Sequence, residues 1–251
     1  MDYEAPIGAF LVVFAVGFGL AFGLSLVGMR LGERWGLVDR PRGRHPHARV
    51  VSKFCGLALW GAFSAAVLLA QMLPVPRMDP MEVVRVAGLL LGGMFCFLFG
   101  LLDDWRELGA FPQYLAQLAA ASIAVVFQIF IEYVNNPLTG VRTDPWPHLV
   151  TVVVTVFWMG LMMNTVNFID GLDGLAAGVA CIAAVVLFIN GVFRLEPAQY
   201  SVGLLPLALI GATLGFLPFN FAPARVFMGT SGSMFLGYTL GSLSIIGGAK
   251  M

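Results

Sequence analysis

Polar side chains recur at every third residue in the stretch 164–175, which lies between two long apolar runs. They are Asn164, Asn167, Asp170 and Asp173. Charged groups near hydrocarbon are costly, so carboxylates retained there are candidates for a functional site. Their oxygen atoms suit a hard divalent cation or a site that orients a charged substrate. The alternative is a helix-terminal loop in which the same side chains are merely solvated.

The spacing of three also constrains the backbone that must position these groups. Three residues turn a regular α-helix by about 300°, so each member points roughly 60° away from the previous one. The side chains converge only if the helix breaks or tightens within the stretch. Gly171 and Gly174 permit this, because glycine adopts backbone angles that other residues resist. We predict a broken helix end that presents amides and carboxylates to a common point.

A second candidate site is the adjacent acid pair Asp103 and Asp104, which follows an apolar run. Two neighbouring carboxylates repel each other, and the partial negative charge of a helix C-terminus adds to the cost. A divalent metal would offset this repulsion, and Mg²⁺ prefers such oxygen ligands. Mn²⁺ is an alternative with similar preferences. The competing interpretation is a solvated acidic turn.

The composition indicates a membrane protein. Apolar residues make up 59% of the 251 residues and charged residues only 11%, against about 25% charged in soluble domains. The formal net charge is zero, so no basic footprint for nucleic acid is visible. Cys55, Cys96 and Cys181 have no metal-binding spacing and are expected to be packing residues.

Eight apolar runs are long enough, or nearly so, to cross the roughly 30 Å of bilayer hydrocarbon as helices. They lie at about 7–29, 54–74, 83–102, 115–132, 147–163, 174–194, 202–219 and 232–249. The first run is too long for a signal-peptide core and is expected to be retained. We therefore predict an all-α, polytopic helical bundle that forms a single transmembrane domain over residues 1–251.

The basic residues predict the orientation of this bundle. Seven of the fourteen Lys and Arg residues fall between the first two spans, in the segment 30–53. Basic loops remain in the cytoplasm, so both termini of the chain are expected outside. Counting spans then gives four cytoplasmic loops, which are 30–53, 103–114, 164–173 and 220–231. The two candidate sites thus share the cytoplasmic face, at the membrane boundary.

Three stretches together resemble the polyprenyl-phosphate N-acetylhexosamine-1-phosphate transferases, a bacterial family also called glycosyltransferase family 4. The stretch from Asn164 to Leu175 is similar to the NxxNxxDGLDGL motif of that family, and Gly100 to Asp104 to its aspartate pair. The stretch from Phe219 to Gly229 is similar to its NxxPAxxFMG segment. The motifs occur in the family's order, and the resemblance covers about residues 30–250.

The resemblance implies an activity and a set of roles. Family members transfer a sugar 1-phosphate from a UDP-sugar to a polyprenyl phosphate such as undecaprenyl phosphate, which initiates cell-envelope glycan synthesis at the inner membrane of bacteria. By resemblance, Asp103 or Asp104 positions or deprotonates the acceptor, while Asp170 and Asp173 shape the nucleotide and metal region. Direct attack and a covalent phospho-enzyme both remain open, and a homodimer is a further expectation.

Other polar residues receive substrate-binding roles from the same resemblance. Asn164 and Asn167 belong to the first motif. Asn220 would orient phosphate or a metal-bound water, and Arg225 would contact diphosphate or a lipid headgroup, unless Arg225 only contributes positive-inside charge. In the basic loop, Arg44 and His47 match the family's VDxPxxRKxH segment. The alternative for this loop is binding of anionic lipid headgroups. The Arg225 segment and this loop favour N-acetylglucosamine over muramoyl-pentapeptide.

Several departures from the family pattern bear on activity. Thr230 stands where the family has an aspartate that binds metal, and Gln113 replaces a lysine. The chain ends at Met251, whereas the family continues through further spans. A second hypothesis is therefore a truncated or altered member that binds lipid phosphate or UDP-sugar without turnover. A transporter is a third, because acids and Gly-interrupted helices also occur there, although these acids cluster at one face.

Overall fold

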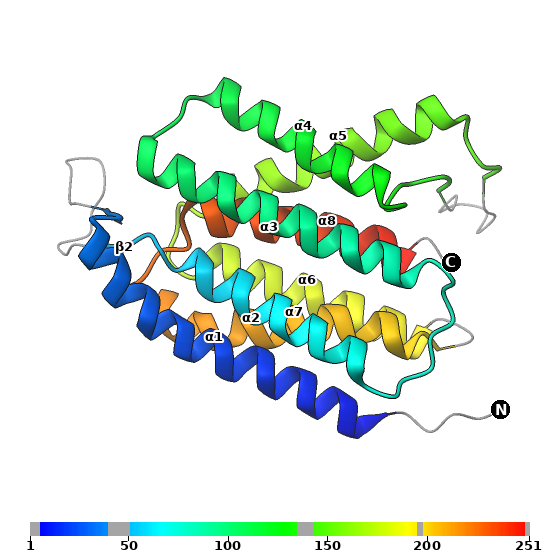
Figure 1. The fold of residues 1–251 in the computed structure, drawn as a ribbon, viewed down its shortest axis with the longest axis horizontal. Helices are drawn as coiled ribbons and strands as arrows, with labels where there is room; N and C mark the ends of the chain where they lie inside the picture. The colour runs from blue at the N-terminus through cyan, green and yellow to red at the C-terminus, as the bar shows by residue number, and fades with distance from the viewer. Residues whose placement is uncertain (1–5, 40–50, 135–142, 195–197, 249–251) are drawn as a thin grey trace.

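The computed structural model describes residues 6–39, 51–134, 143–194 and 198–248. Its described part contains eight α-helices that run back and forth along one direction (Figure 1). Their bounds are α1 Ile7–Trp35, α2 Gly56–Met72, α3 Glu82–Arg106, α4 Ala110–Val126, α5 His148–Ile169, α6 Leu175–Ile189, α7 Tyr200–Asn220 and α8 Gly229–Gly248. A short π-helical turn, η1 (Asn190–Arg194), extends α6.

Each of the eight predicted runs is a helix, so the all-α bundle is confirmed. Five of the helices are long and apolar enough to cross a membrane: α1, α3, α5, α6 together with η1, and α7. The helices α2 and α4 are apolar but shorter, at 17 residues each. The helix α8 carries many glycines and hydroxyl side chains, and nearly all of it is buried by its neighbours. The chain is a multi-pass membrane protein.

The α8 helix lies at the centre of the bundle, against α3 on one side and α5 on the other. Glycines permit this close packing. A Cβ added at Gly100 of α3 would collide with the backbone of Ser231, and one added at Gly237 would lie 2.5 Å from the Cα of Met163 in α5. Small residues at helix interfaces allow backbones to approach in membranes. This packing places the end of α3 beside the start of α8.

A second small-residue contact joins the first helix to α7. A Cβ added at Gly211 would lie 2.7 Å from the carbonyl oxygen of Phe14, and one at Gly215 would collide with that of Phe18. Gly17 faces the same seam, 3.0 Å from the carbonyl oxygen of Ala208 when given a Cβ. The two helices therefore touch through their backbones, although they are far apart in the sequence.

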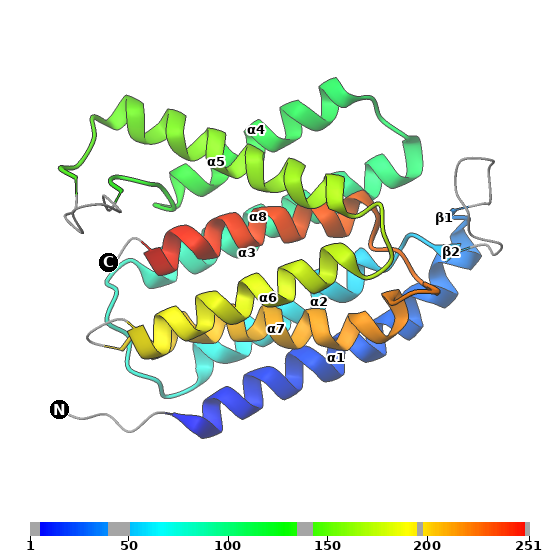
Figure 2. The same cartoon turned by 180° about the vertical axis from the view of Figure 1, so that it is seen from behind.

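The segments 103–114, 164–173 and 220–231 lie at one end of the bundle, as Figure 2 also shows from behind. We call this the motif end, and the other the opposite end. The helix α1 begins, and α8 ends, at the opposite end (Figure 1). The alternation of spans thus agrees with the prediction, and the assignment of the motif end to the cytoplasm stays a prediction.

A small hairpin at the motif end was not predicted. Strand β1 (Val38–Asp39) pairs antiparallel with β2 (Val51–Ser52). Ser52 also bridges to Val226 in parallel, and the Phe227 N–H donates a hydrogen bond of 2.8 Å to the carbonyl oxygen of Ser52. The hairpin that follows α1 is therefore tied to the segment between α7 and α8.

At the opposite end, buried charges have partners within the protein. Arg85 Nη1 lies 2.7 Å from Asp79 Oδ2, and its Nε donates to the carbonyl oxygen of Gln128 at 3.0 Å. Glu82 is buried and accepts a 2.7 Å hydrogen bond from the Ser201 hydroxyl. Its other oxygen lies 3.8 Å from Arg77. These contacts join the starts of α3 and α7 to the connection between α2 and α3.

Candidate active site

Asp104 is held against the first turn of α8. The Thr230 N–H donates to its Oδ1 at 2.8 Å, and the Ser231 N–H donates to its Oδ2 at 3.0 Å. These amides carry the partial positive charge of the helix N-terminus, which favours an ionised carboxylate. Gly229 has a φ of 66°, and a Cβ there would lie 2.5 Å from Asp104 Oδ2. Glycine is therefore required for this capping arrangement.

Asp103 points elsewhere, because consecutive helical residues project about 100° apart. It is buried, and its Oδ2 accepts a 3.0 Å hydrogen bond from Gln113 Nε2 in α4. Its Oδ1 is buried without a hydrogen-bond partner among the described residues. The acid pair is thus divided: Asp104 faces α8, and Asp103 faces α4. The residue Gln113, noted as a departure from the family pattern, is the neutral partner of Asp103.

The two asparagines of the first motif have separate partners, because both precede the break in the helix. Asn164 exchanges hydrogen bonds with Gln117 of α4, at 2.7 Å from its Nδ2 and 3.2 Å to its Oδ1. Asn167 donates to the Ser233 hydroxyl of α8 at 3.0 Å. The two asparagines of the motif therefore do not converge, and Asn164 joins α5 to α4.

The predicted break occurs at Asp170, which follows the last residue of α5. Gly174, with a φ of 73°, is the N-cap residue immediately before α6. Burial raises the pKa of the Asp170 carboxyl well above its ordinary value, and the negative charge of Asp104 raises it further. The two carboxyl groups therefore act on each other electrostatically. A bound cation would lower this pKa, because an opposite charge favours the ionised form.

Asp173 and the segment 220–228 form a linked loop region. Asp173 is exposed, and its Oδ2 accepts a 2.9 Å hydrogen bond from the Ala224 N–H. Asn220 is buried and donates to the Val226 carbonyl at 2.9 Å. Its amide thus shapes the loop that leads into α8, while Arg225 is exposed on that loop. Arg44 and His47 lie outside the described residues.

The four predicted metal ligands are not gathered at one point. Among the described residues, no group of three or more His, Cys, Asp or Glu side chains is arranged to hold a metal ion. Asp103 faces α4 and Asp173 faces the 220–228 loop, so Asp104 and Asp170 remain as the carboxylates that act on each other electrostatically. Mg²⁺ commonly binds through one or two carboxylates, with waters and substrate phosphates as its other ligands. This pair fits that pattern.

The sequence matches the family model described as Glycosyl transferase family 4 over residues 86–248, which contain all three motifs. The chain belongs to glycosyl transferase family 4. Members of this family among curated proteins include a decaprenyl-phosphate N-acetylglucosaminephosphotransferase of Mycolicibacterium smegmatis, 34% identical over 219 residues. That alignment covers 85% of this chain and 54% of the relative.

Two further curated proteins are similar to this chain. A probable undecaprenyl-phosphate N-acetylglucosaminyl 1-phosphate transferase of Bacillus subtilis is 32% identical, with 94% of this chain and 62% of the relative covered. A phospho-N-acetylmuramoyl-pentapeptide-transferase of Staphylococcus saprophyticus is 37% identical, with 59% and 49% covered. The chain thus spans about half to three fifths of the length of these relatives.

Three residues of the candidate site in this chain were not singled out from the sequence. Gln117 pairs with Asn164, Ser233 accepts from Asn167, and Lys53 exerts an attractive electrostatic effect on Asp104. Gln117 offered one signal, because an amide inside an apolar run is costly without a partner. Ser233 and Lys53 offered none, since their roles depend on which helices become neighbours.

Proposed function

We propose that this chain carries out the transfer of N-acetylglucosamine 1-phosphate from UDP-N-acetylglucosamine to a polyprenyl phosphate. The observation that supports this most directly is the capping of α8 by Asp104. It joins the aspartate pair to the end of the NxxPAxxFMG segment at a helix N-terminus. Asp170 of the first motif lies within electrostatic reach of the same carboxylate. These observations support a single site to which all three motifs contribute.

The reaction forms a bond between an oxygen of the lipid phosphate and the phosphorus that carries the sugar. The bond from that phosphorus to UMP breaks, and UMP leaves with the electron pair. Asp104 is fixed by two amides, so it can orient or deprotonate the acceptor phosphate without first reorganising. Asp103, buried and bound to Gln113, positions the end of α3 against α4.

Asp104 and Asp170 are the residues that would hold Mg²⁺ or Mn²⁺. When bound, such an ion neutralises diphosphate charge and stabilises the departing UMP. Arg225 is the exposed cation on the loop beside Asp173, and it is placed to meet the diphosphate or a headgroup. Lys53 adds positive charge near Asp104. We propose that this site faces the cytoplasm at the bacterial inner membrane, where a soluble nucleotide sugar and a membrane-held acceptor can meet.

The choice of sugar rests on the comparisons. The relatives whose names specify N-acetylglucosamine align with 85% and 94% of this chain. The relative that acts on the muramoyl-pentapeptide aligns with 59%. The relatives named for N-acetylglucosamine thus align with more of this chain, which supports N-acetylglucosamine as the donor sugar.

A transfer assay tests the proposal. The purified chain is incubated with undecaprenyl phosphate, Mg²⁺ and radiolabelled UDP-N-acetylglucosamine, and lipid-linked label is extracted into butanol. Parallel reactions contain labelled UDP-N-acetylmuramoyl-pentapeptide, or dolichyl phosphate as acceptor. We expect lipid-linked product from UDP-N-acetylglucosamine and none from the muramoyl-pentapeptide donor. Product only from the muramoyl donor would contradict the assignment of the sugar.

Thr230 favours a second candidate function, in which the chain binds substrates without turnover. A threonine hydroxyl offers one neutral oxygen where the family has a carboxylate. In this structure Thr230 lies at the start of α8, and its N–H is bound to Asp104. Binding of labelled UDP-N-acetylglucosamine without lipid-linked product would support this second function over the first.

A further inference from the structure

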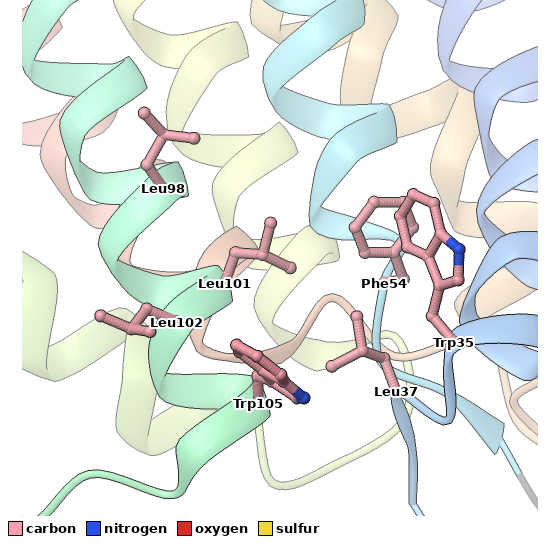
Figure 3. Close-up of a pocket in the computed structure, with 7 residues that line it drawn as sticks. All are labelled: Trp35, Leu37, Phe54, Leu98, Leu101, Leu102 and Trp105. Carbon is pink, nitrogen blue, oxygen red and sulfur yellow. The ribbon is translucent and has the colours of Figure 1, made fainter.

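A cavity of about 450 Å³ lies at the motif end, away from the α8 face of Asp104. Its lining side chains are all apolar: Trp35, Leu37, Phe54, Leu98, Leu101, Leu102 and Trp105. Figure 3 shows Leu101 and Trp105 pointing from α3 towards Phe54, Trp35 and Leu37. Small-molecule sites commonly occupy about 300–1,000 Å³. The cavity is therefore large enough for part of a bound molecule.

The α3 wall of this cavity is a single stripe of the helix. Its members follow the spacing i, i+3, i+4 and i+7, which is one face of an α-helix. The stripe runs about 10 Å along the helix axis, from Leu98 to Trp105 near the helix end. Asp104 lies off this stripe, since its carboxylate is bound by the start of α8. The cavity and the proposed catalytic site thus use different faces of α3.

The other wall is made by the end of α1 and the hairpin. Trp35 packs edge to face on Phe54, with ring centroids 5.1 Å apart. The Lys53 N–H donates to the carbonyl oxygen of Leu37 at 2.9 Å, which fixes the hairpin beside them. The wall therefore does not depend on a ligand for its shape. Trp35 and Trp105 remain 57% and 66% exposed, so the cavity is open at its rim.

The rim has the chemistry of a membrane interface. Tryptophans are enriched at the level of lipid headgroups, where the apolar ring and the indole N–H are both satisfied. Arg106 stacks on Trp105, with its guanidinium carbon 5.3 Å from the ring centroid. Arg34 is exposed in the last turn of α1, beside Trp35. An apolar slot with a cation at its mouth, and a second cation on the adjoining turn of α1, is complementary to a lipid with an anionic headgroup.

Two exposed carboxylates lie near these cations: Glu33 in the last turn of α1 and Glu107 just after α3. They offset part of the charge of Arg30, Arg34 and Arg106, so the position of each cation relative to the cavity matters more than the net charge of the described helix ends. Arg106 is the cation with a fixed position, because its guanidinium rests on a residue that lines the cavity.

We propose that this cavity is a binding site for an anionic phospholipid such as phosphatidylglycerol, with an acyl chain along the Leu98–Trp105 stripe and its phosphate at Arg106 and Arg34. The site is separate from the proposed transferase site. Its test therefore measures lipid binding alone, and it does not depend on whether the chain has transferase activity.

The full chain is reconstituted in phosphatidylcholine vesicles that contain increasing fractions of brominated phosphatidylglycerol, and quenching of tryptophan fluorescence is recorded. The reverse titration uses brominated phosphatidylcholine. We expect quenching to saturate at a low fraction of phosphatidylglycerol. The double variant Arg106→Gln, Arg34→Gln should weaken the preference for phosphatidylglycerol over phosphatidylcholine about fivefold for each charge removed. Arg194→Gln, which removes an exposed cation from the opposite end, is the matched control and should leave it unchanged.

A second pair of variants tests the slot itself. The double variant Leu98→Phe, Leu101→Phe narrows the cavity and should reduce quenching by both brominated lipids. Leu91→Phe alters an exposed site on the same helix outside the cavity, so it is the control and should leave the quenching unchanged. Equal quenching by the two lipids in the unaltered chain would overturn the proposal. So would an unchanged preference in the arginine variant, or displacement of phosphatidylglycerol by an equimolar amount of undecaprenyl phosphate, which would assign the cavity to the acceptor.

Discussion

The two ends of the bundle treat their acidic side chains differently. At the opposite end, Asp79 lies against Arg85, and Glu82 lies against Ser201 and Arg77. At the motif end, Asp103 and Asp104 are held by neutral amides, and Asp104 raises the pKa of a neighbouring acid. Acids paired with internal cations stabilise the fold, whereas amides orient a carboxylate without neutralising its charge. This contrast supports our proposal that the functional site lies at the motif end.

The largest effect expected from this contrast is on catalysis. Asp104→Asn should lower the rate of transfer at least about 100-fold, because an amide can neither accept a proton nor offset a cation. One N–H of the α8 start can still bind the remaining oxygen, so the protein should stay folded. The rate is measured with labelled donor on protein that elutes as a single species from a sizing column.

Asp79→Asn is the control for that experiment, since it changes a carboxyl group of the same type at the opposite end. It should retain the rate per folded molecule. A similar loss of rate in both variants would contradict the proposed difference between the two ends, because it would show that both ends contribute alike to catalysis.

The next effect concerns stability at the opposite end. Glu82→Ala leaves the Ser201 hydroxyl and Arg77 without their carboxylate, and hydrogen bonds to charged groups contribute about 1.5–3 kcal/mol. We expect a loss of that size in the free energy of unfolding, measured by titration with a denaturing detergent. Activity per folded molecule should not change. Glu132→Ala, which removes an exposed acid from the same end, should have little effect on either quantity.

A smaller effect is expected from restoring the family's acid. Thr230→Asp adds a carboxylate at the start of α8, beside the Asp104 and Asp170 pair. It should tighten Mg²⁺ binding about tenfold, because each acidic ligand adds attraction for a divalent cation. Titration calorimetry with and without UDP-N-acetylglucosamine measures this, with Thr230→Asn as the uncharged control. Equal affinities in all three proteins would mean that residue 230 is not a metal ligand.

The smallest effect should come from the amide pair between α4 and α5. Gln117 and Asn164 satisfy each other, and hydrogen bonds between membrane helices contribute about 0.6 kcal/mol on average. A double-mutant cycle of Gln117→Ala and Asn164→Ala should give a coupling of that order in unfolding experiments. A rate loss above tenfold in Asn164→Ala alone would instead make Asn164 a substrate-binding residue, as the sequence suggested.

The length of the apolar runs was enough to predict all eight helices, because a span needs about 20 apolar residues wherever it packs. The helix break at Asp170 also followed from the sequence, since Gly174 permits the required backbone. The hairpin did not, because strands of two residues carry no periodicity.

The partners of the site residues could not be predicted either, since they depend on which helices become neighbours. Asp104 meets residues 126 and 127 positions further along the chain, and only the packing of α3 on α8 brings them together. The prediction that Asn220 orients a phosphate or a metal-bound water stays a prediction; its observed partner, the carbonyl of Val226 in a buried turn, could not be predicted. The local sequence does not show that the Val226 carbonyl requires a hydrogen-bond donor.

The backbone contact between α1 and α7 affects how the protein is made. Ribosomes add about 5–20 residues per second, so α1 enters the membrane on the order of ten seconds before α7 is complete. During this interval the Gly17 face of α1 has only lipid or other helices against it. Gly211 and Gly215 supply the matching surface late in synthesis. The order of translation thus makes α7 the element that closes the bundle around its earliest helix.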